Sequence, residues 1–249
     1  MTEKKNDDIE VCFREKVADV LVSGKKVGTV SFKSNPYHKK HCYLELEFVS
    51  FEGIDAITVF EKLKIRIKKP LQVMVSSEEQ KIISFLKKAG FKCKRKCYEI
   101  EAQKKDYIGG EKEEKLFVAQ AGENIYKRCC DMMLGRYITT HDAINPWTGT
   151  KEDFYNNLPD KVFYNVVNGN IKNVAFVEDN EIAYVYGTDK VEFSAFAEVL
   201  LTEMFKEHDT ITFEADDCDE YAMILKSLFI NQLDESFDTY ILQDKDSTI

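Results

Sequence analysis

Alternating apolar and polar residues run along much of the chain, interrupted by short turn signals. In the first half, residues 10–24 and residues 25–35 alternate on either side of Ser23-Gly24, which predicts a hairpin. Residues 41–51 predict a third strand, with glutamates on one face and leucines on the other. The chain therefore opens with three predicted strands.

Helical spacing follows in the same half. Residues 54–69 repeat apolar positions every three or four residues, and Pro70 closes this predicted helix. Residues 71–77 predict a short strand of the kind buried in a sheet centre. Residues 76–90 predict a helix with a serine N-cap and a left-handed C-cap at Gly90, before a last strand over 91–101. The order is β-β-β-α-β-α-β.

The second half repeats this order behind an extra strand and two helices. The extra elements are a strand over 115–120, a helix over 121–138 and a short helix after Thr150. Three strands then turn at Asn168-Gly169 and Asp179-Asn180. A helix, a strand, a helix and a closing strand over 235–242 complete the chain. The duplication is the strongest signal in the sequence.

Charge divides the chain at the same place. Residues 1–115 hold 25 Lys+Arg and 19 Asp+Glu, a net of +6, and residues 116–249 hold 10 and 25, a net of −15; the sum is the −9 of the whole chain. We therefore predict an N-terminal domain over 1–105, a linker over 106–115 and a C-terminal domain over 116–249. The opposite charges predict that the two domains contact each other as a pseudo-dimer, and a homodimer stays open as the alternative.

Several classes of protein are disfavoured by the composition. No run of 18 apolar residues predicts a membrane span, and the charged N-terminus lacks the apolar core of a signal peptide. Seven cysteines without such a signal indicate a reducing, cytoplasmic setting. Cys93 and Cys97 lack a second ligand pair nearby, so no metal site is predicted. The basic run 92–97 has no interleaved aromatics, which argues against nucleic acid binding.

The repeated order resembles the GNAT superfamily of N-acetyltransferases. The best local match is LKKAGF, residues 86–91, against the family's "Y-x-K-x-G-F"; LKSLFI, residues 225–230, takes that place in the second half. The resemblance implies an α+β fold of two tandem GNAT-like domains. Each would be a mixed, mostly antiparallel sheet flanked by helices, with the first domain truncated and the second complete.

The resemblance also implies acetyl-CoA as the acyl donor. The family's pyrophosphate marker "Q/R-x-x-G-x-G/A" corresponds to EFSAFA, residues 192–197, where Glu192 replaces the Gln or Arg and alanines replace the glycines. By position, the backbone of Tyr186, Gly187 and Thr188 would flank the thioester. The N–H groups of Ser194, Ala195 and Phe196 would face the pyrophosphate.

Candidate catalytic residues come from the acidic run 214–220 and the helix after it. Glu214 and Asp216 would line the side of the cleft that takes a cationic amine, while capping of the helix is an equally good interpretation of Asp216. The family's proton-donating tyrosine is replaced by leucine in both halves. Tyr221, one turn earlier, is the substitute candidate, with an ordinary half-buried aromatic as the alternative. His141 stands isolated and is assigned no role.

Two functions remain open at this point. One is a GNAT-family N-acetyltransferase that transfers an acetyl group from acetyl-CoA to a small-molecule or peptide amine. The alternative is a catalytically inactive GNAT-fold binding or scaffold protein. The complete second half favours the enzyme, whereas Glu192, the missing glycines and the missing tyrosines favour the alternative.

Overall fold

The computed structural model describes residues 9–110, 112 and 115–243, and they divide into two compact units. Unit 1 comprises Met1–Arg95, Ala143–Thr148 and Phe237–Ile249. Unit 2 comprises Lys96–Asp142 and Gly149–Ser236. Among the described residues, no helix is both long and apolar enough to cross a membrane.

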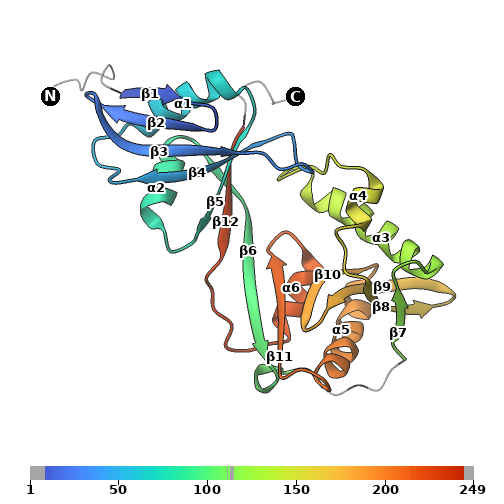
Figure 1. The fold of residues 1–249 in the computed structure, drawn as a ribbon. Coiled ribbons are helices and arrows are strands. Elements are labelled where there is room, and N and C mark those ends of the chain that lie inside the picture. Colours follow the sequence, from blue (N-terminus) through green and yellow to red (C-terminus); the bar gives the residue numbers. More distant parts are fainter. Residues whose placement is uncertain (1–8, 111, 113–114, 244–249) are drawn as a thin grey trace. The chain divides into compact units, whose positions relative to one another are not determined.

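Unit 1 is a six-stranded mixed sheet with two helices (Figure 1). Its elements are β1 (Ile9–Phe13), β2 (Val17–Val22), β3 (Lys25–Lys33), β4 (Cys42–Phe48), α1 (Ala56–Ile67), β5 (Leu71–Ser76), α2 (Gln80–Lys88) and β12 (Phe237–Leu242). The strand order is β1-β2-β3-β4-β5-β12, and only β4 and β5 are parallel. Both helices bury their apolar faces in one core with the strands.

The first predicted strand of unit 1 is in fact two strands. The polar run Arg14–Lys16 breaks the alternation, and the Arg14 N–H donates to the Val17 carbonyl at 2.8 Å to close a turn between β1 and β2. The predicted turn at Ser23-Gly24 is confirmed, because both residues have the positive φ (51° and 74°) that a tight hairpin requires.

Helix α2 ends as predicted but begins differently. Gly90 has φ 91°, and the Phe91 N–H returns to the Leu86 carbonyl at 3.1 Å, so Phe91 is buried against Phe60. The predicted serine N-cap is wrong. The N-cap is Glu79, without a side-chain cap bond, and the Ser76 hydroxyl instead accepts from the Glu78 N–H.

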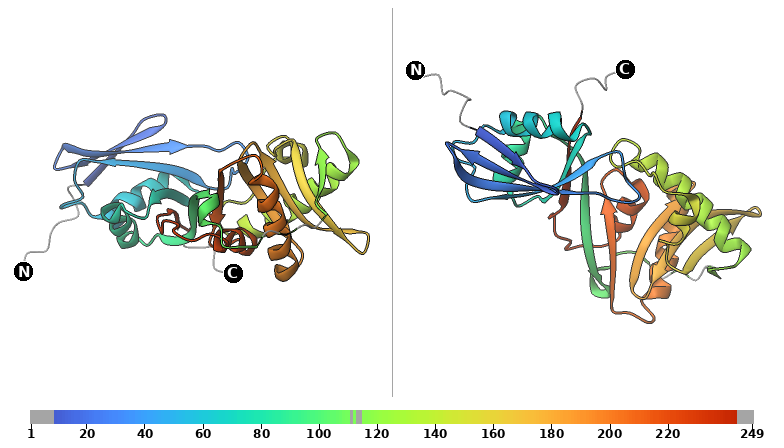
Figure 2. Two further views of the ribbon diagram at one scale, coloured as in Figure 1. Left: turned by 90° about the horizontal axis from the view of Figure 1, so that it is seen from below. Right: turned by 45° about the horizontal axis from the view of Figure 1, so that its top comes forward.

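Unit 2 is a second mixed sheet with helices on both faces (Figure 2). Its elements are β6 (Lys92–Gln103, in unit 2 from Lys96), the 3₁₀ turn η2 (Lys104–Asp106), β7 (Phe117–Gln120), α3 (Asn124–His141), α4 (Lys151–Tyr155), β8 (Lys161–Val167), β9 (Asn170–Glu178), β10 (Glu181–Gly187), α5 (Lys190–Met204), β11 (Thr210–Asp216) and α6 (Glu220–Ser227). The strand order is β6-β11-β10-β9-β8-β7.

The two faces of this sheet can be told apart along β9. Ala175 and Val177 belong to the core that α5 and α6 fill. Phe176, between them, points to the other face, where it meets Tyr126 of α3 at 5.7 Å between ring centroids. Helices α5 and α6 therefore cover one face, and α3 covers the opposite one. Thr150 caps α4 with a capping box to Asp153, as its sequence predicts.

The final strands of the two halves do not join the sheets that the sequence predicts. Strand β12 pairs antiparallel with β5 in unit 1, from Phe237↔Ser76 to Leu242↔Leu71. Strand β6 pairs antiparallel with β11 in unit 2, from Thr210↔Gln103 to Asp216↔Cys97. The units therefore depart from the expected boundaries of 1–105 and 116–249, because a strand pattern specifies an element and not its partner.

Candidate ligand site at the gap between β10 and β11

Two parallel strands separate in the middle of the unit 2 sheet. Within the described residues, the pairing of β10 with β11 is limited to Glu181↔Thr212 and Ile182↔Phe213. The register of β10 against β9 shifts between Ile182 and Tyr184, which is the mark of a β-bulge. Because the bulge re-aims the strand, β10 and β11 diverge over the rest of their length and leave a gap in the sheet.

The backbone of β10 offers donors to this gap. The Thr188 N–H donates to the Lys172 carbonyl at 3.0 Å, on the β9 side. Alternate residues of an antiparallel pair bond to the same neighbour, so the N–H groups of Val185 and Gly187 point away from β9 and towards the gap. Of the predicted trio, Gly187 thus has its donor on the gap side, whereas the Thr188 donor is already used.

Tyr221 is packed into the wall of the gap. It is 5% exposed, and its ring makes edge contacts with Tyr186 at 5.5 Å and Phe193 at 5.0 Å between centroids. The Arg136 guanidinium lies over the same ring at 5.2 Å. Burial raises the pKa of Tyr221, so the phenol stays protonated, but its ring is held on three sides.

Helix α3 contributes two basic side chains, Arg136 and His141, that no sequence spacing indicates. Arg136 Nη2 lies 3.0 Å from Asp219 Oδ1, and Asp219 caps α6 by accepting from the Tyr221 N–H. His141 Nε2 lies 3.8 Å from Asp216 Oδ2. His141 and Asp216 are 75 positions apart in the chain (216 − 141), so only the fold brings them together. Asp216 therefore faces a histidine of α3, and Asp219 performs the capping that we considered for Asp216.

Glu214 lies on the same face of β11 but in a separate hollow. A cavity of about 480 Å³ is lined there by four glutamates, Glu99, Glu101, Glu181 and Glu214, together with residues of the 231–233 loop. In register, Glu214 lies opposite Glu99. Burial, and secondly the charge of Glu214, raise the pKa of Tyr184 nearby. The three predicted catalytic residues thus line different surfaces, since Tyr221 packs into the core on the α5 side.

Comparison with known proteins identifies the fold. No protein-family model and no curated protein matches the sequence. Among solved structures, a GCN5-related N-acetyltransferase from Sphaerobacter thermophilus is similar, with a TM-score of 0.52 at 8% identity, over 92% of this chain and 80% of that one. The chain has a GNAT-like fold over most of its length.

Two further GNAT structures are similar over most of the chain. An acetyltransferase of the GNAT family from Colwellia psychrerythraea has a TM-score of 0.47 at 10% identity, over 91% of this chain and 85% of that one. A tandem GNAT protein from the clavulanic acid biosynthesis pathway has a TM-score of 0.46 at 6% identity, over 95% and 84%.

The GNAT pyrophosphate position in unit 2 is occupied by helix. The segment 192–197 that matches the family marker lies inside α5, which begins at Lys190. Ser194, Ala195 and Phe196 lie beyond the first four N–H groups of the helix, so their N–H groups bond to carbonyls one turn earlier. The expectation that these three residues present donors to a pyrophosphate is therefore wrong.

Two of the donors at the start of α5 are used by the Asp189 side chain. Its carboxylate accepts from the N–H groups of Val191 at 2.9 Å and Glu192 at 3.0 Å. A bound anion would meet the negative charges of Asp189 and Glu192 there, which opposes binding. An acyl-CoA pyrophosphate does not fit this helix terminus.

Close packing explains why the connection between β10 and α5 is so short. Only Thr188 and Asp189 connect β10 to the helix. A Cβ on Gly187 would lie 2.6 Å from Asn173 Oδ1 and 2.9 Å from Phe193 Cβ, so only glycine lets the helix start this close to the strand. In unit 1 seven residues, 49–55, separate β4 from α1, and there too an aspartate, Asp55, caps the helix by accepting from the Thr58 N–H.

Proposed function

We propose that this tandem GNAT-fold protein is a binding protein whose unit 2 recognises a cationic amine without transferring an acetyl group to it. The observation that carries the proposal is the capping of α5 by Asp189, with the marker segment 192–197 built into the helix. Without those donors, unit 2 lacks the anion site on which the family's use of acetyl-CoA depends.

The acidic cavity beside β11 supports an amine as the ligand. Its four glutamates line one hollow of about 480 Å³, at the end of β10 and β11 where these two strands are paired. Carboxylates gathered in a concave surface focus negative potential and attract a cation. A small-molecule amine, or the lysine or N-terminal amine of a peptide, has the required charge.

The second candidate is an acetyl-CoA-dependent N-acetyltransferase. The diverging strands, the β-bulge of β10 and the gap-facing N–H groups of Val185 and Gly187 favour it, because they resemble the features by which the fold holds a thioester. Glu214 and Asp216 would then serve as proton acceptors, and Tyr221 as the proton donor. We propose a cytoplasmic setting for either function, which the odd number of cysteines, seven, supports.

Calorimetric titration of the full chain separates the two candidates. We expect no acetyl-CoA binding at millimolar concentration. Micromolar binding that Ala195→Asp abolishes would overturn the binding-protein proposal in favour of the enzyme.

A separate titration tests the amine ligand. We expect spermidine to bind and Glu214→Gln to weaken spermidine binding. The control Glu207→Gln, on the exposed surface beyond α5, should leave it unchanged. Failure of spermidine to bind at low salt would refute the amine ligand.

A further inference from the structure

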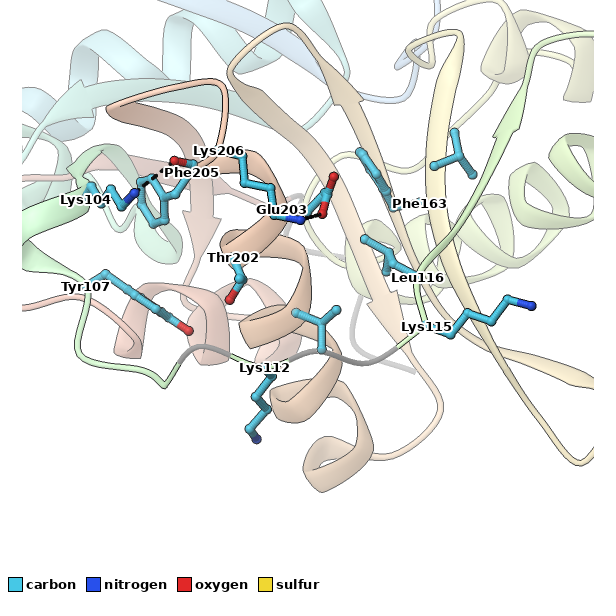
Figure 3. Close-up of a pocket in the computed structure, with 12 residues that line it drawn as sticks. Lys104, Tyr107, Lys112, Lys115, Leu116, Phe163, Thr202, Glu203, Phe205 and Lys206 are labelled. Carbon is cyan, nitrogen blue, oxygen red and sulfur yellow. Dashed lines mark hydrogen bonds and ion pairs between the residues drawn. The ribbon is translucent and has the colours of Figure 1, made fainter.

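A second cavity in unit 2 lies away from the gap, beside the outer surface of α5. It has a volume of about 860 Å³ (Figure 3). Figure 3 shows Thr202, Glu203 and Lys206 from α5 and the residues after it, with Lys104 and Tyr107 on one side and Phe163 and Leu116 on the other. The volume is within the range of small-molecule sites.

One part of the cavity is apolar. Phe163, Val199 and Phe205 form a buried floor, each exposed by 5–6%. Val118, which is 46% exposed, extends this floor along β7 together with Leu116. Apolar surface that is open to solvent gains free energy when an apolar chain covers it.

The other part carries positive charge. Four lysines line the cavity (Lys104, Lys112, Lys115 and Lys206) against a single lining glutamate, Glu203. Lys104 Nζ donates to the Phe205 carbonyl at 3.1 Å, which leaves the remaining N–H groups of that ammonium for other acceptors. Lys206 pairs with Glu203 at 2.5 Å, but the lysine is 63% exposed, so this pair is weak and exchangeable.

Local charge contrasts with that of the surrounding chain. Counting Glu198, which pairs with Lys112 at 2.9 Å, the four lysines still exceed the two carboxylates by two charges. Unit 2, residues 96–142 and 149–236, carries a net of −14 as a whole (14 Lys+Arg against 28 Asp+Glu). A basic end next to an apolar floor in an acidic unit selects one ligand chemistry by complementarity.

We infer that this cavity binds an anionic amphiphile, a single apolar chain ending in a carboxylate. The carboxylate would sit between Lys104 and Lys206 beside Phe205, and the chain would run over Phe163, Leu116 and Val118. This site is separate from the gap and independent of the proposed amine function, since it uses the opposite face of the unit 2 sheet.

Calorimetry of the full chain with dodecanoate, below its micelle concentration, tests the inference. We expect saturable binding at one site. Dodecyltrimethylammonium, of equal chain length and opposite charge, should bind at least about tenfold more weakly. Equal affinity for both amphiphiles, or no saturable binding of dodecanoate, would overturn the inference.

Variants locate the site. Lys206→Glu should weaken dodecanoate binding about tenfold, because it reverses the charge at the carboxylate end. Val118→Asp should weaken it similarly from the apolar end, and the partial exposure of Val118 makes that variant tolerable to the fold. Lys127→Glu, on exposed α3, is the matched control and should have no effect. Unchanged affinity in both Lys206→Glu and Val118→Asp would place any binding elsewhere and refute the assignment.

Discussion

Unit 1 depends on the last strand of the chain, and truncation tests this dependence. Strand β12 contributes six residues in register with β5, and four of them are buried: Asp238, Thr239, Tyr240 and Ile241. Deleting residues 237–249 removes this strand but leaves every other element of unit 1 in place. Unit 2 loses no strand by the same deletion.

The size of the effect follows from burial and pairing. Tyr240 is 2% and Ile241 1% exposed, and burying side chains of this size is worth about 1.5–3 kcal/mol each. The lost ladder adds roughly 0.5–1.5 kcal/mol for each hydrogen bond. Together these reach about 5 kcal/mol or more, which is comparable to the whole stability of a typical domain, about 5–15 kcal/mol. We therefore expect unit 1 to unfold.

Hydrogen exchange resolved by peptide is the suitable assay, because it reports each unit separately. In the chain truncated after Ser236, peptides covering α1 and β5 should lose protection, while those covering β8 and β9 keep it. A chain truncated after Gln243 retains β12 and is the control. Undiminished protection of β5 in the shorter chain would refute the assignment of β12 to unit 1.

Further outcomes are expected at single residues. Phe237→Ala should cost far less than Ile241→Ala, for which we expect about 2–5 kcal/mol in chemical denaturation, because Phe237 is 39% exposed. Gly187→Ala should lower the melting temperature, since the new methyl group meets Asn173 and Phe193. Thr150→Ala should cost about 1 kcal/mol through its cap, whereas Thr150→Ser should not. Burial raises the pKa of the Cys129 thiol from 9.0 to about 12. The stability that this buried, neutral thiol contributes is therefore complete below pH 9 and is lost as the pH rises from 9 to 12. Alkaline unfolding curves in which stability does not fall in this window would contradict the prediction.

Local chemistry made much of the fold predictable. Gly90, Ser23-Gly24 and Thr150 specify their caps and turns through their own conformational preferences, and each lies where its chemistry requires. The extra turn at residues 14–16 was missed because three polar residues can extend an alternating strand or interrupt it. The partners of β6 and β12 could not be predicted for a different reason: the alternation of a strand specifies which residues share a face, and it does not specify which distant strand pairs with it.

The candidate site was predictable only in part. The positions of Gly187 and Glu214 follow from the order of elements, because that order fixes the ends of β10 and β11. Helix content in 192–197 overrode the family resemblance, since Phe193, Phe196 and Ala197 recur at helical spacing and are all buried. His141 and Arg136 could not be found from spacing, because their partners Asp216 and Asp219 lie on elements that only the tertiary fold brings near α3.

The gap in the unit 2 sheet is supported by the chain itself and does not depend on a bound cofactor. The bulge of β10 turns the strand away from β11. Tyr186 and Tyr221 fill the wall of the opening, while Arg136 joins α3 to the cap of α6. These contacts stabilise the divergent strands. Because packing holds the gap open, Asp189 can occupy the donors at the start of α5 while the gap persists. The shape of the sheet alone therefore does not establish acetyl transfer. The capped start of α5 weighs more in our proposal of a function.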